Sequence, residues 1–182
     1  MIKITPHLVL NEIDIQDQPN LLRLMHQVYP QTYAHLWQDQ GTNYINTVYG
    51  LENFQQELQD PNSLYCFVVY DETIVGILRL LDNASLVDLP NEPATKLHRI
   101  YIDNNVKGKG IGKALIDWTT QRAAKQGHTI VWLEAMDTQE AAIGFYEKQG
   151  FSISGKDRLE LDLLYPHLRG MYRMWKHAIK MI

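Results

Sequence analysis

The chain has little cysteine and lacks any long run of apolar residues. Its single cysteine, Cys66, excludes an internal disulfide and a thiolate metal cluster. No apolar stretch approaches the roughly 18 residues that a membrane span needs, and Met1–Pro6 lacks the apolar run of a signal peptide. The seven histidines show neither an H-E-x-x-H pattern nor a close ligand pair. These absences predict a soluble, cytoplasmic protein with no metal site and no membrane partner.

The composition is that of a folded domain. The chain has 182 residues, of which 45% are hydrophobic and 21% are charged. Because disorder requires low hydrophobicity and high charge, a disordered protein is excluded. Since domains usually hold about 100–200 residues, we expect one domain that spans residues 1–182.

Charge is unevenly placed along the chain. Residues 1–95 hold twelve acids and three bases, a formal charge of −9, whereas residues 96–182 carry +5. One interpretation is that solvated faces happen to segregate by sign. The other is a protein with two ligands, an anionic one on the C-terminal half and a cationic one near the N-terminal half. Since no dense basic stripe occurs, nucleic acid is not an expected partner.

Apolar periodicity and turn residues predict alternating strands and helices. The expected helices are residues 20–29, Leu51–Gln59, residues 111–126 and Gln139–Gln149, the last closed by Gly150. The expected strands are Ile2–Leu10, Leu64–Tyr70, Thr73–Leu81, Lys96–Ile102, Ile130–Ala135, Phe151–Ser154 and Arg169–Trp175. No regular element is expected in the aromatic segment 30–50. This order predicts a mixed sheet with helices on both sides, in the α/β (α+β) class.

A glycine-rich turn precedes the third helix. Glycines alternate with other residues from Lys107 to Gly112, which leaves backbone N–H groups open at a helix N-terminus that favours negative charge. A plain structural turn would look similar. A P-loop is excluded because Lys107 occupies the place of its first glycine and Ala114 that of its magnesium-binding hydroxyl. A dinucleotide fingerprint is excluded because Lys113 stands where its third glycine belongs.

The spacing that fits is [Q/R]-x-x-G-x-[G/A], so the sequence resembles the GNAT superfamily of N-acetyltransferases. Lys107 replaces the Gln or Arg of that motif and keeps its cation. Residues 142–151, A-I-G-F-Y-E-K-Q-G-F, resemble the family's A-x-x-F-Y-x-x-x-G-F helix and the strand after it, and residues 97–102 resemble its central strand. The two motifs lie in the family's order, and the resemblance covers Leu97–Phe151.

The resemblance implies a GNAT fold with a twisted sheet of about six or seven strands and a splayed fourth strand. It implies acetyl-CoA as cosubstrate, with its pantetheine arm along the exposed backbone of Ile100, Tyr101 and Ile102. The pyrophosphate would rest on the turn. The residues implied there are Lys107, Gly108, Lys109, Gly110, Ile111, Gly112 and Lys113, with Gln139 in place of an Asn that touches the cofactor in many members.

Acetyl transfer to an amine requires a neutral amine, a stabilised oxyanion and a protonated leaving thiolate. The family's pattern makes Tyr146 the acid, although its ring could instead be an ordinary helix aromatic. His98 is the candidate base, because imidazole can take a proton at neutral pH. A core histidine would also fit that position. Glu134 is the rival base or relay, and a chain of waters without a single base is the third alternative.

The acceptor is expected to be a primary amine. The charge asymmetry favours a cationic small molecule, and the layout of residues 20–81 resembles bacterial spermidine/spermine N-acetyltransferases. A polyamine-like acceptor would then be attracted by the acids of residues 39–95. The alternatives are a peptide or protein amine, an aminoglycoside, or a non-catalytic CoA-binding regulatory module. A homodimer is common in the family.

Two groups of side chains admit a plainer interpretation. Five aromatic residues could line an acceptor pocket or pack on one another: Tyr29, Tyr33, Trp37, Tyr44 and Tyr49. Cys66 lies in an apolar strand and is expected to be a small core residue rather than a nucleophile.

Overall fold

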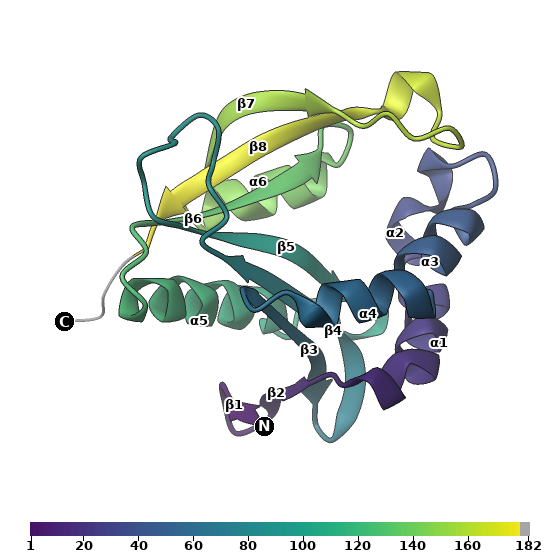
Figure 1. The fold of residues 1–182 in the computed structure, drawn as a ribbon, viewed down its shortest axis with the longest axis horizontal. Coiled ribbons are helices and arrows are strands. Elements are labelled where there is room, and N and C mark those ends of the chain that lie inside the picture. Colours follow the sequence, from purple (N-terminus) through teal and green to yellow (C-terminus); the bar gives the residue numbers. More distant parts are fainter. Residues whose placement is uncertain (179–182) are drawn as a thin grey trace. The chain divides into compact units, whose positions relative to one another are not determined.

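The computed structural model describes residues 1–178. Over this range eight strands form one mixed sheet in the order β1-β2-β3-β4-β5-β6-β8-β7 (Figure 1). The α/β fold predicted from the sequence is confirmed. The chain divides into two compact units, residues 1–79 with 99–111, and residues 80–98 with the described residues from 112 on. The boundary falls within β4 and within β5, so each of these strands contributes to both units.

The first unit contains four helices and the N-terminal strands. Its elements are β1 (Ile2–Lys3), β2 (Leu8–Glu12), α1 (Gln18–Val28), α2 (Pro30–Tyr33), α3 (Thr42–Val48), α4 (Leu51–Gln59), β3 (Ser63–Tyr70), β4 (Thr73–Asp82) up to Arg79, and β5 (Ala94–Ile102) from Arg99 on. Helix α1 buries Leu21, Met25 and Val28, which recur at helical spacing on one face. The helix that was expected at Leu51–Gln59 is confirmed with those bounds.

The single strand expected at Ile2–Leu10 is wrong. The Thr5 hydroxyl accepts hydrogen bonds from the N–H groups of His7 and Leu8, and Pro6 has no N–H to give to a ladder. The chain therefore turns there, and β1 pairs antiparallel with β2. This extra strand raises the count above the expected six or seven.

The aromatic segment 30–50 is helical, which its sequence did not predict. Pro30 occupies the first position of α2, where a missing N–H costs nothing. Gly41 precedes α3 with a positive φ of 86°, and the Asp39 carboxylate accepts hydrogen bonds from the Gly41 and Asn43 N–H groups. Turn chemistry and helix starts, rather than apolar periodicity, define these short helices.

The second unit contains the remaining strands and two helices. Its elements are β4 from Leu80, β5 up to His98, α5 (Ile111–Lys125) from Gly112, β6 (Ile130–Met136), α6 (Glu140–Lys148), β7 (Ser152–Arg158) and β8 (Gly170–His177). One core cluster joins Ala94, Ile130, Trp132 and Leu86, with Trp175 packed against it. The predicted bounds of α5, β6 and α6 differ from these by one residue.

The parallel ladder between β5 and β6 is short. It pairs Ala94–Lys96 with Ile130–Trp132, whereas the two strands continue to Ile102 and Met136. A strand that splays from its neighbour produces a ladder of this kind.

Candidate functional site

The glycine-rich turn is open to solvent and leads directly into α5. Gly108 and Gly110 have positive φ angles of 81° and 76°, and an added Cβ would meet no atom within 4 Å at either. Residues 107–110 are exposed, while Ile111 is buried and fixes the first residue of α5. Glycine adopts this left-handed conformation without strain, and the turn is followed directly by α5, whose dipole is positive at its start. This local geometry suits an anion.

Asp103 fixes the chain just before this turn. Its buried carboxylate accepts hydrogen bonds from the Asn105 N–H at 2.9 Å and from the Gln27 side chain at 2.8 Å. The Gln31 side chain donates to the same carboxylate. The Asp103 N–H donates to the Val75 carbonyl of β4 at 2.8 Å. The approach to the turn is therefore tied to α1, α2 and β4.

Lysines surround the turn, as the sequence predicted, and two of them already have contacts. The Lys109 ammonium lies 5.0 Å from the centre of the Tyr70 ring. Lys113 forms an ion pair with Asp117 one helical turn later, and both side chains are largely exposed. Both contacts are on the surface, where such pairs are weak, so an anion could replace them at little cost.

The backbone of β5 offers hydrogen-bonding groups at Ile100 and Ile102 rather than at Tyr101. The Tyr101 carbonyl oxygen lies 2.0 Å from where a Cβ on Gly76 of β4 would stand, and the Asp103 N–H also points to β4. Because backbone groups alternate between the two edges of a strand, those of Ile100 and Ile102 point away from β4. Of the three residues implied by the resemblance, we therefore expect Ile100 and Ile102 to be the ones that can pair with an extended ligand.

Glu134, the rival base, is already engaged. The Lys96 ammonium donates to its carboxylate at 2.7 Å and lies 4.3 Å from the centre of the Trp132 ring. Lys96 is the last β5 residue in the ladder with β6, so this ion pair joins the two strands where the ladder ends. His98 follows two residues later on β5 and is half-buried.

Tyr146 lies in the last turn of α6, which ends in a Schellman motif. The Phe151 N–H donates to the Tyr146 carbonyl at 3.1 Å, and Gly150 has a positive φ of 88°. The Tyr146 and Phe151 rings meet edge to face with centroids 5.8 Å apart, which is the apolar contact that accompanies this motif. The role of Gly150 as the C-terminal cap is confirmed.

The third glycine of the turn packs closely against a neighbour on α6. A Cβ on Gly112 would stand 3.2 Å from Cζ of Phe145, so the Phe145 ring lies against the first turn of α5. The two sequence motifs thus touch each other directly. Sequence reasoning missed this contact, because nothing in the spacing links Gly112 to a residue 33 positions later. Gln139, at the other end of α6, is half-buried and precedes its first residue.

The aromatic residues proposed for an acceptor pocket pack on one another. The Tyr29 ring stacks on Tyr33 and Tyr44 at centroid distances of 5.0 and 5.1 Å, and its hydroxyl accepts a hydrogen bond from the Trp37 indole. Tyr101 meets Tyr29 edge to face. Burial raises the pKa of Tyr33 to about 12 and that of Tyr101 well above its usual value. These contacts favour the packing interpretation, with phenols that stay neutral at physiological pH.

A buried ion network beside these aromatics was not foreseen. The Glu57 carboxylate accepts two hydrogen bonds from Arg99, at 2.7 and 2.8 Å, and one from Arg79 at 2.7 Å. The hydroxyls of Tyr49 and Tyr65 are buried and have no hydrogen-bond partner among the described residues. The sequence signal was the pair of arginines within otherwise apolar strands, since buried arginines need a carboxylate.

Most acids of residues 39–95 have internal partners. Asp39 accepts from backbone N–H groups of α3, Glu57 from Arg79 and Arg99, Asp60 from the Asn62 N–H, Asp71 from His7, Asp82 from Arg122, Asp88 from Arg173, and Glu92 from Thr129. Arginines thus neutralise Glu57, Asp82 and Asp88, whereas the other partnered acids accept from neutral donors or from His7. The acids of this segment therefore give less support to a cationic acceptor than the sequence suggested.

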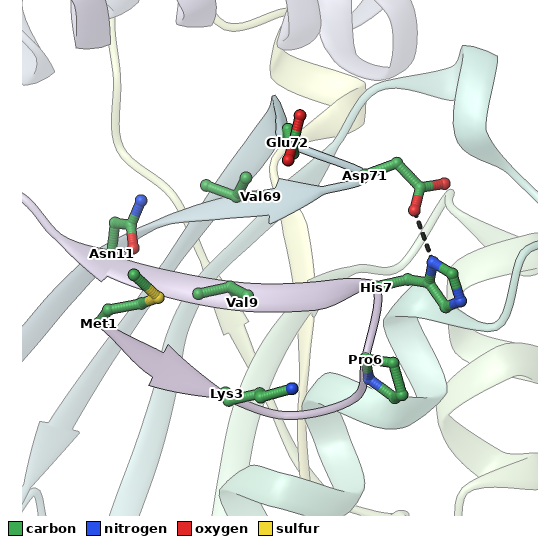
Figure 2. Close-up of a pocket in the computed structure, with 9 residues that line it drawn as sticks. All are labelled: Met1, Lys3, Pro6, His7, Val9, Asn11, Val69, Asp71 and Glu72. Atoms are coloured by element: carbon green, nitrogen blue, oxygen red, sulfur yellow. Dashed lines mark hydrogen bonds and ion pairs between the residues drawn. The ribbon is translucent and has the colours of Figure 1, made fainter.

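A separate hollow lies on the first unit and contains none of the predicted residues. It has a volume of about 720 Å³ and is lined by residues of β1, β2, β3 and the β3–β4 turn, among them Lys3, Val9, Val69 and Glu72 (Figure 2). A hydrogen bond of 2.7 Å joins His7 and Asp71, two of the residues that line it.

Three further sequence expectations concern Cys66, metals and membranes. Cys66 is fully buried in β3, as a core residue should be. Within residues 1–178, no group of three or more His, Cys, Asp or Glu side chains could hold a metal ion. No helix in this range is long and apolar enough to cross a bilayer.

The fold and the glycine-rich turn define an α/β protein with an exposed turn before α5, and known proteins identify its family. The model of the acetyltransferase (GNAT) family matches residues 22–151. The chain therefore belongs to the GNAT acetyltransferase family, and the predicted enzyme class, an N-acetyltransferase, is confirmed.

Relatives of known sequence or structure agree with this family. Human N-acetyltransferase 8B is 32% identical over 54% of the chain, but the match spans only 43% of that protein. PaiA N-acetyltransferase from Thermoplasma acidophilum, solved with coenzyme A, has a TM-score of 0.70 and 19% identity, and the match covers 93% of this chain and 98% of that one. Spermidine N-acetyltransferase from Vibrio cholerae, solved with CoA and spermine, has a TM-score of 0.67 and 15% identity, with 96% and 97% covered.

Proposed function

We propose that this protein transfers the acetyl group of acetyl-CoA directly to a primary amine. The observation that carries the proposal is the turn at Gly108 and Gly110, whose two left-handed glycines stand in open space just before α5. Family membership supplies the chemistry that such an anion site would serve. In this proposal the turn binds the diphosphate of CoA with Lys107, Lys109 and Lys113. The outward backbone groups of Ile100 and Ile102 bind the pantetheine amides, and Gln139 also contacts the cofactor.

The chain's own groups move the protons of the reaction. A primary amine with a pKa near 10.4 is only about 0.04% neutral at pH 7, which costs about 4.6 kcal/mol, so a base is useful. His98 removes the ammonium proton, and the neutral nitrogen attacks the thioester carbon. The new C–N bond forms as the C–S bond breaks. The Tyr146 hydroxyl then gives its proton to the departing thiolate. The attacking nitrogen loses its second proton, which restores the Tyr146 hydroxyl through solvent, and His98 releases the first proton to solvent.

His98 stays our candidate base, and Glu134, which accepts a hydrogen bond from Lys96, stays the rival. The Lys96–Glu134 pair is also well shielded, with side chains 15% and 28% exposed. In this proposal Glu134 acts as a structural partner of Lys96.

The proposed acceptor is a small cationic amine such as a polyamine. The support is the shared fold with a spermidine N-acetyltransferase that was solved with spermine. Glu52 and Glu72 are exposed acids that can attract a cation. The internal pairing of the other acids leaves peptide amines, protein lysines and aminoglycosides as alternatives. A cytoplasmic location and a homodimer also stay predictions.

An acceptor panel tests the proposal. The purified chain is incubated with acetyl-CoA and, in turn, spermine, a lysine peptide, an aminoglycoside and acidic amino acids, and CoA release is measured. We expect the highest kcat/KM for spermine, with a decrease as ionic strength rises, because screening weakens the attraction of a polycation. Turnover confined to neutral or acidic acceptors would contradict the cationic acceptor but not the acetyl transfer. CoA binding without turnover of any amine would instead favour the regulatory module.

A further inference from the structure

One lysine outside the predicted site contacts the cap that holds Tyr146. Lys176 lies on β8, where its backbone is fixed in the ladder with β6 opposite Val131. Its ammonium donates a hydrogen bond to the Gln149 carbonyl at the end of α6, at 2.7 Å. The same ammonium lies 5.6 Å from the centre of the Phe151 ring. Figure 1 shows α6 beside β8, the strand from which this side chain comes.

Gln149 and Phe151, the two residues that Lys176 contacts, both form hydrogen bonds with Tyr146. The Gln149 N–H donates to the Tyr146 carbonyl at 2.9 Å, and the Phe151 N–H donates to the same oxygen at 3.1 Å. The Phe151 ring also packs edge to face on the Tyr146 ring. The position of Tyr146 therefore depends on two residues that share one cationic partner.

The charge of the Lys176 ammonium is favourable at the C-terminal end of α6. The last carbonyls of a helix lack intrahelical donors and carry the negative end of the dipole, so a cation there satisfies both needs. Burial lowers the pKa of Lys176, Asp117 on α5 opposes this shift, and Lys113 adds to it. Lys113 and Asp117 are thus the charged groups of α5 that act on Lys176.

We propose that Lys176 is a positioning residue that holds Tyr146 in the orientation needed to protonate the leaving thiolate. The inference rests on the proposed function, in which Tyr146 is the acid. Lys176 does not contact the reacting atoms. It acts by fixing the Gln149 carbonyl and the Phe151 ring from a strand that is paired along both edges.

The experiment uses Lys176→Met, which keeps the aliphatic stem but removes the ammonium, and Lys176→Arg, which retains a cationic donor. With acetyl-CoA and spermine, we expect Lys176→Met to lower kcat about tenfold, because small misplacements of a reacting group are costly. The KM for acetyl-CoA should stay within about twofold, since the amides of the turn are unchanged. Lys176→Arg should restore most of kcat. Lys125→Met, which removes an exposed ammonium at the end of α5, is the matched control and should not change kcat.

A double-mutant cycle separates positioning from general destabilisation. If Lys176 acts through Tyr146, Lys176→Met should have no further effect on kcat in a Tyr146→Phe background. An equal loss in both backgrounds would overturn the proposal, as would an unchanged kcat in Lys176→Met. If Tyr146→Phe itself retains full activity, the assignment of the acid fails, and the positioning role fails with it.

NMR gives a readout that does not depend on the acceptor. In protein with ¹³C-labelled tyrosine rings, the Tyr146 signal is identified by its loss in Tyr146→Phe. We expect Lys176→Met to shift or broaden this signal and to speed amide exchange at Phe151, while Lys125→Met leaves both unchanged. A Tyr146 signal and a Phe151 exchange rate that match the wild type would overturn the proposal even if the wild type acetylates spermine.

Discussion

The Tyr146 side chain and carbonyl belong to the C-terminal cap of α6 before any chemistry is considered. Its carbonyl accepts the Phe151 N–H, and its ring packs on the Phe151 ring. This packing explains why an aromatic residue is suited to the position, but it does not require a hydroxyl. Ring packing thus explains the aromatic ring of Tyr146, whereas the proposed catalytic role concerns its hydroxyl.

Replacement of Tyr146 by Phe separates these two roles. Because Phe keeps the ring, we expect the free energy of unfolding to change by less than about 0.5 kcal/mol. Loss of the proton donor should lower kcat by about 10- to 100-fold, and the Kd for CoA should stay within twofold of the wild type. Steady-state kinetics, urea unfolding and calorimetry measure the three quantities. Tyr172→Phe, another half-buried tyrosine of the second unit, is the control, and an equal loss of kcat in it would contradict the role of Tyr146.

The pH–rate profile distinguishes His98 from Glu134. A histidine base must be neutral to act, so the rate should fall as the pH decreases into the range in which its imidazole takes up a proton. We expect this acidic limb to vanish in His98→Ala and to remain in Glu134→Gln, which keeps an acceptor for Lys96. A limb that persists in His98→Ala but moves in Glu134→Gln would make Glu134 the base.

At the scale of elements, the sequence predicts those whose pattern is local. The α6 helix was foreseen because Gly150 and Phe151 signal a Schellman cap within six residues of Tyr146. The short helices between residues 30 and 50 were not, because their aromatic residues are buried by mutual stacking rather than by one periodic face. The break between β1 and β2 was missed because Thr5 and Pro6 interrupt an otherwise apolar run.

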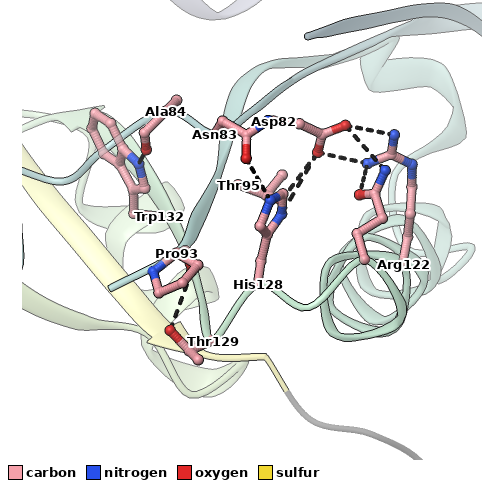
Figure 3. Close-up of polar contacts among 10 residues, drawn as sticks. Asp82, Asn83, Ala84, Pro93, Thr95, Arg122, His128, Thr129 and Trp132 are labelled. Atoms are coloured by element: carbon pink, nitrogen blue, oxygen red, sulfur yellow. Dashed lines mark hydrogen bonds and ion pairs between the residues drawn. The ribbon is translucent and has the colours of Figure 1, made fainter. Parts of the chain in front are cut away.

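An ion pair between Asp82 and Arg122 joins the end of β4 to the last turns of α5. The Asp82 carboxylate accepts two hydrogen bonds from Arg122, both at 2.8 Å, and one from Thr95 at 3.2 Å (Figure 3). His128 lies in the same cluster, with Nδ1 2.6 Å from the Thr95 hydroxyl. Burial alone would raise the pKa of Asp82, but the hydrogen bonds and charge of Arg122 outweigh it and lower that pKa.

Asp82→Asn should therefore reduce stability in a pH-dependent way. Near pH 7 we expect the free energy of unfolding to fall by about 2 kcal/mol, the usual worth of hydrogen bonds to a charged group. Because the folded-state pKa of Asp82 is lowered, its contribution is complete above the unfolded pKa of about 3.9 and is lost as pH falls through the folded pKa. The difference between wild type and variant should shrink at that acid end.

Urea unfolding across this pH range measures the difference. Asp117→Asn removes an exposed pair with Lys113 and should cost about 0.5 kcal/mol or less. Equal losses in the two variants, or a loss in Asp82→Asn that is independent of pH, would contradict the role given to Arg122.

At the scale of the whole molecule, the unequal charge of the two halves of the sequence has a structural explanation. Acids of the N-terminal half pair with bases far along the chain, such as Glu57 with Arg99 and Asp88 with Arg173. Linear segregation of charge is therefore compatible with local neutrality in the fold. The composition shows that charge is unequal between the two halves of the sequence, but it does not show which acids and bases form ion pairs.

The candidate site shows the same division between local and long-range information. The turn at Gly108 and Gly110 and the position of Tyr146 follow from spacings that the sequence contains. The engagement of Glu134 by Lys96, and the packing of Phe145 on Gly112, join residues more than 30 positions apart. Such pairs depend on the register of strands and the packing of helices, which no local pattern encodes.

Calorimetric titration with CoA tests the central claim that open amides at the start of α5 bind a diphosphate. Gly110→Ala is compared with Gly127→Ala, because both glycines have positive φ angles and open space around them. Both variants should therefore lose about 1 kcal/mol of folding stability. We expect the wild type and Gly127→Ala to bind CoA alike and Gly110→Ala to bind at least about tenfold more weakly, a loss of about 1.4 kcal/mol. No heat of CoA binding in the wild type, or equal weakening in both variants, would contradict the account.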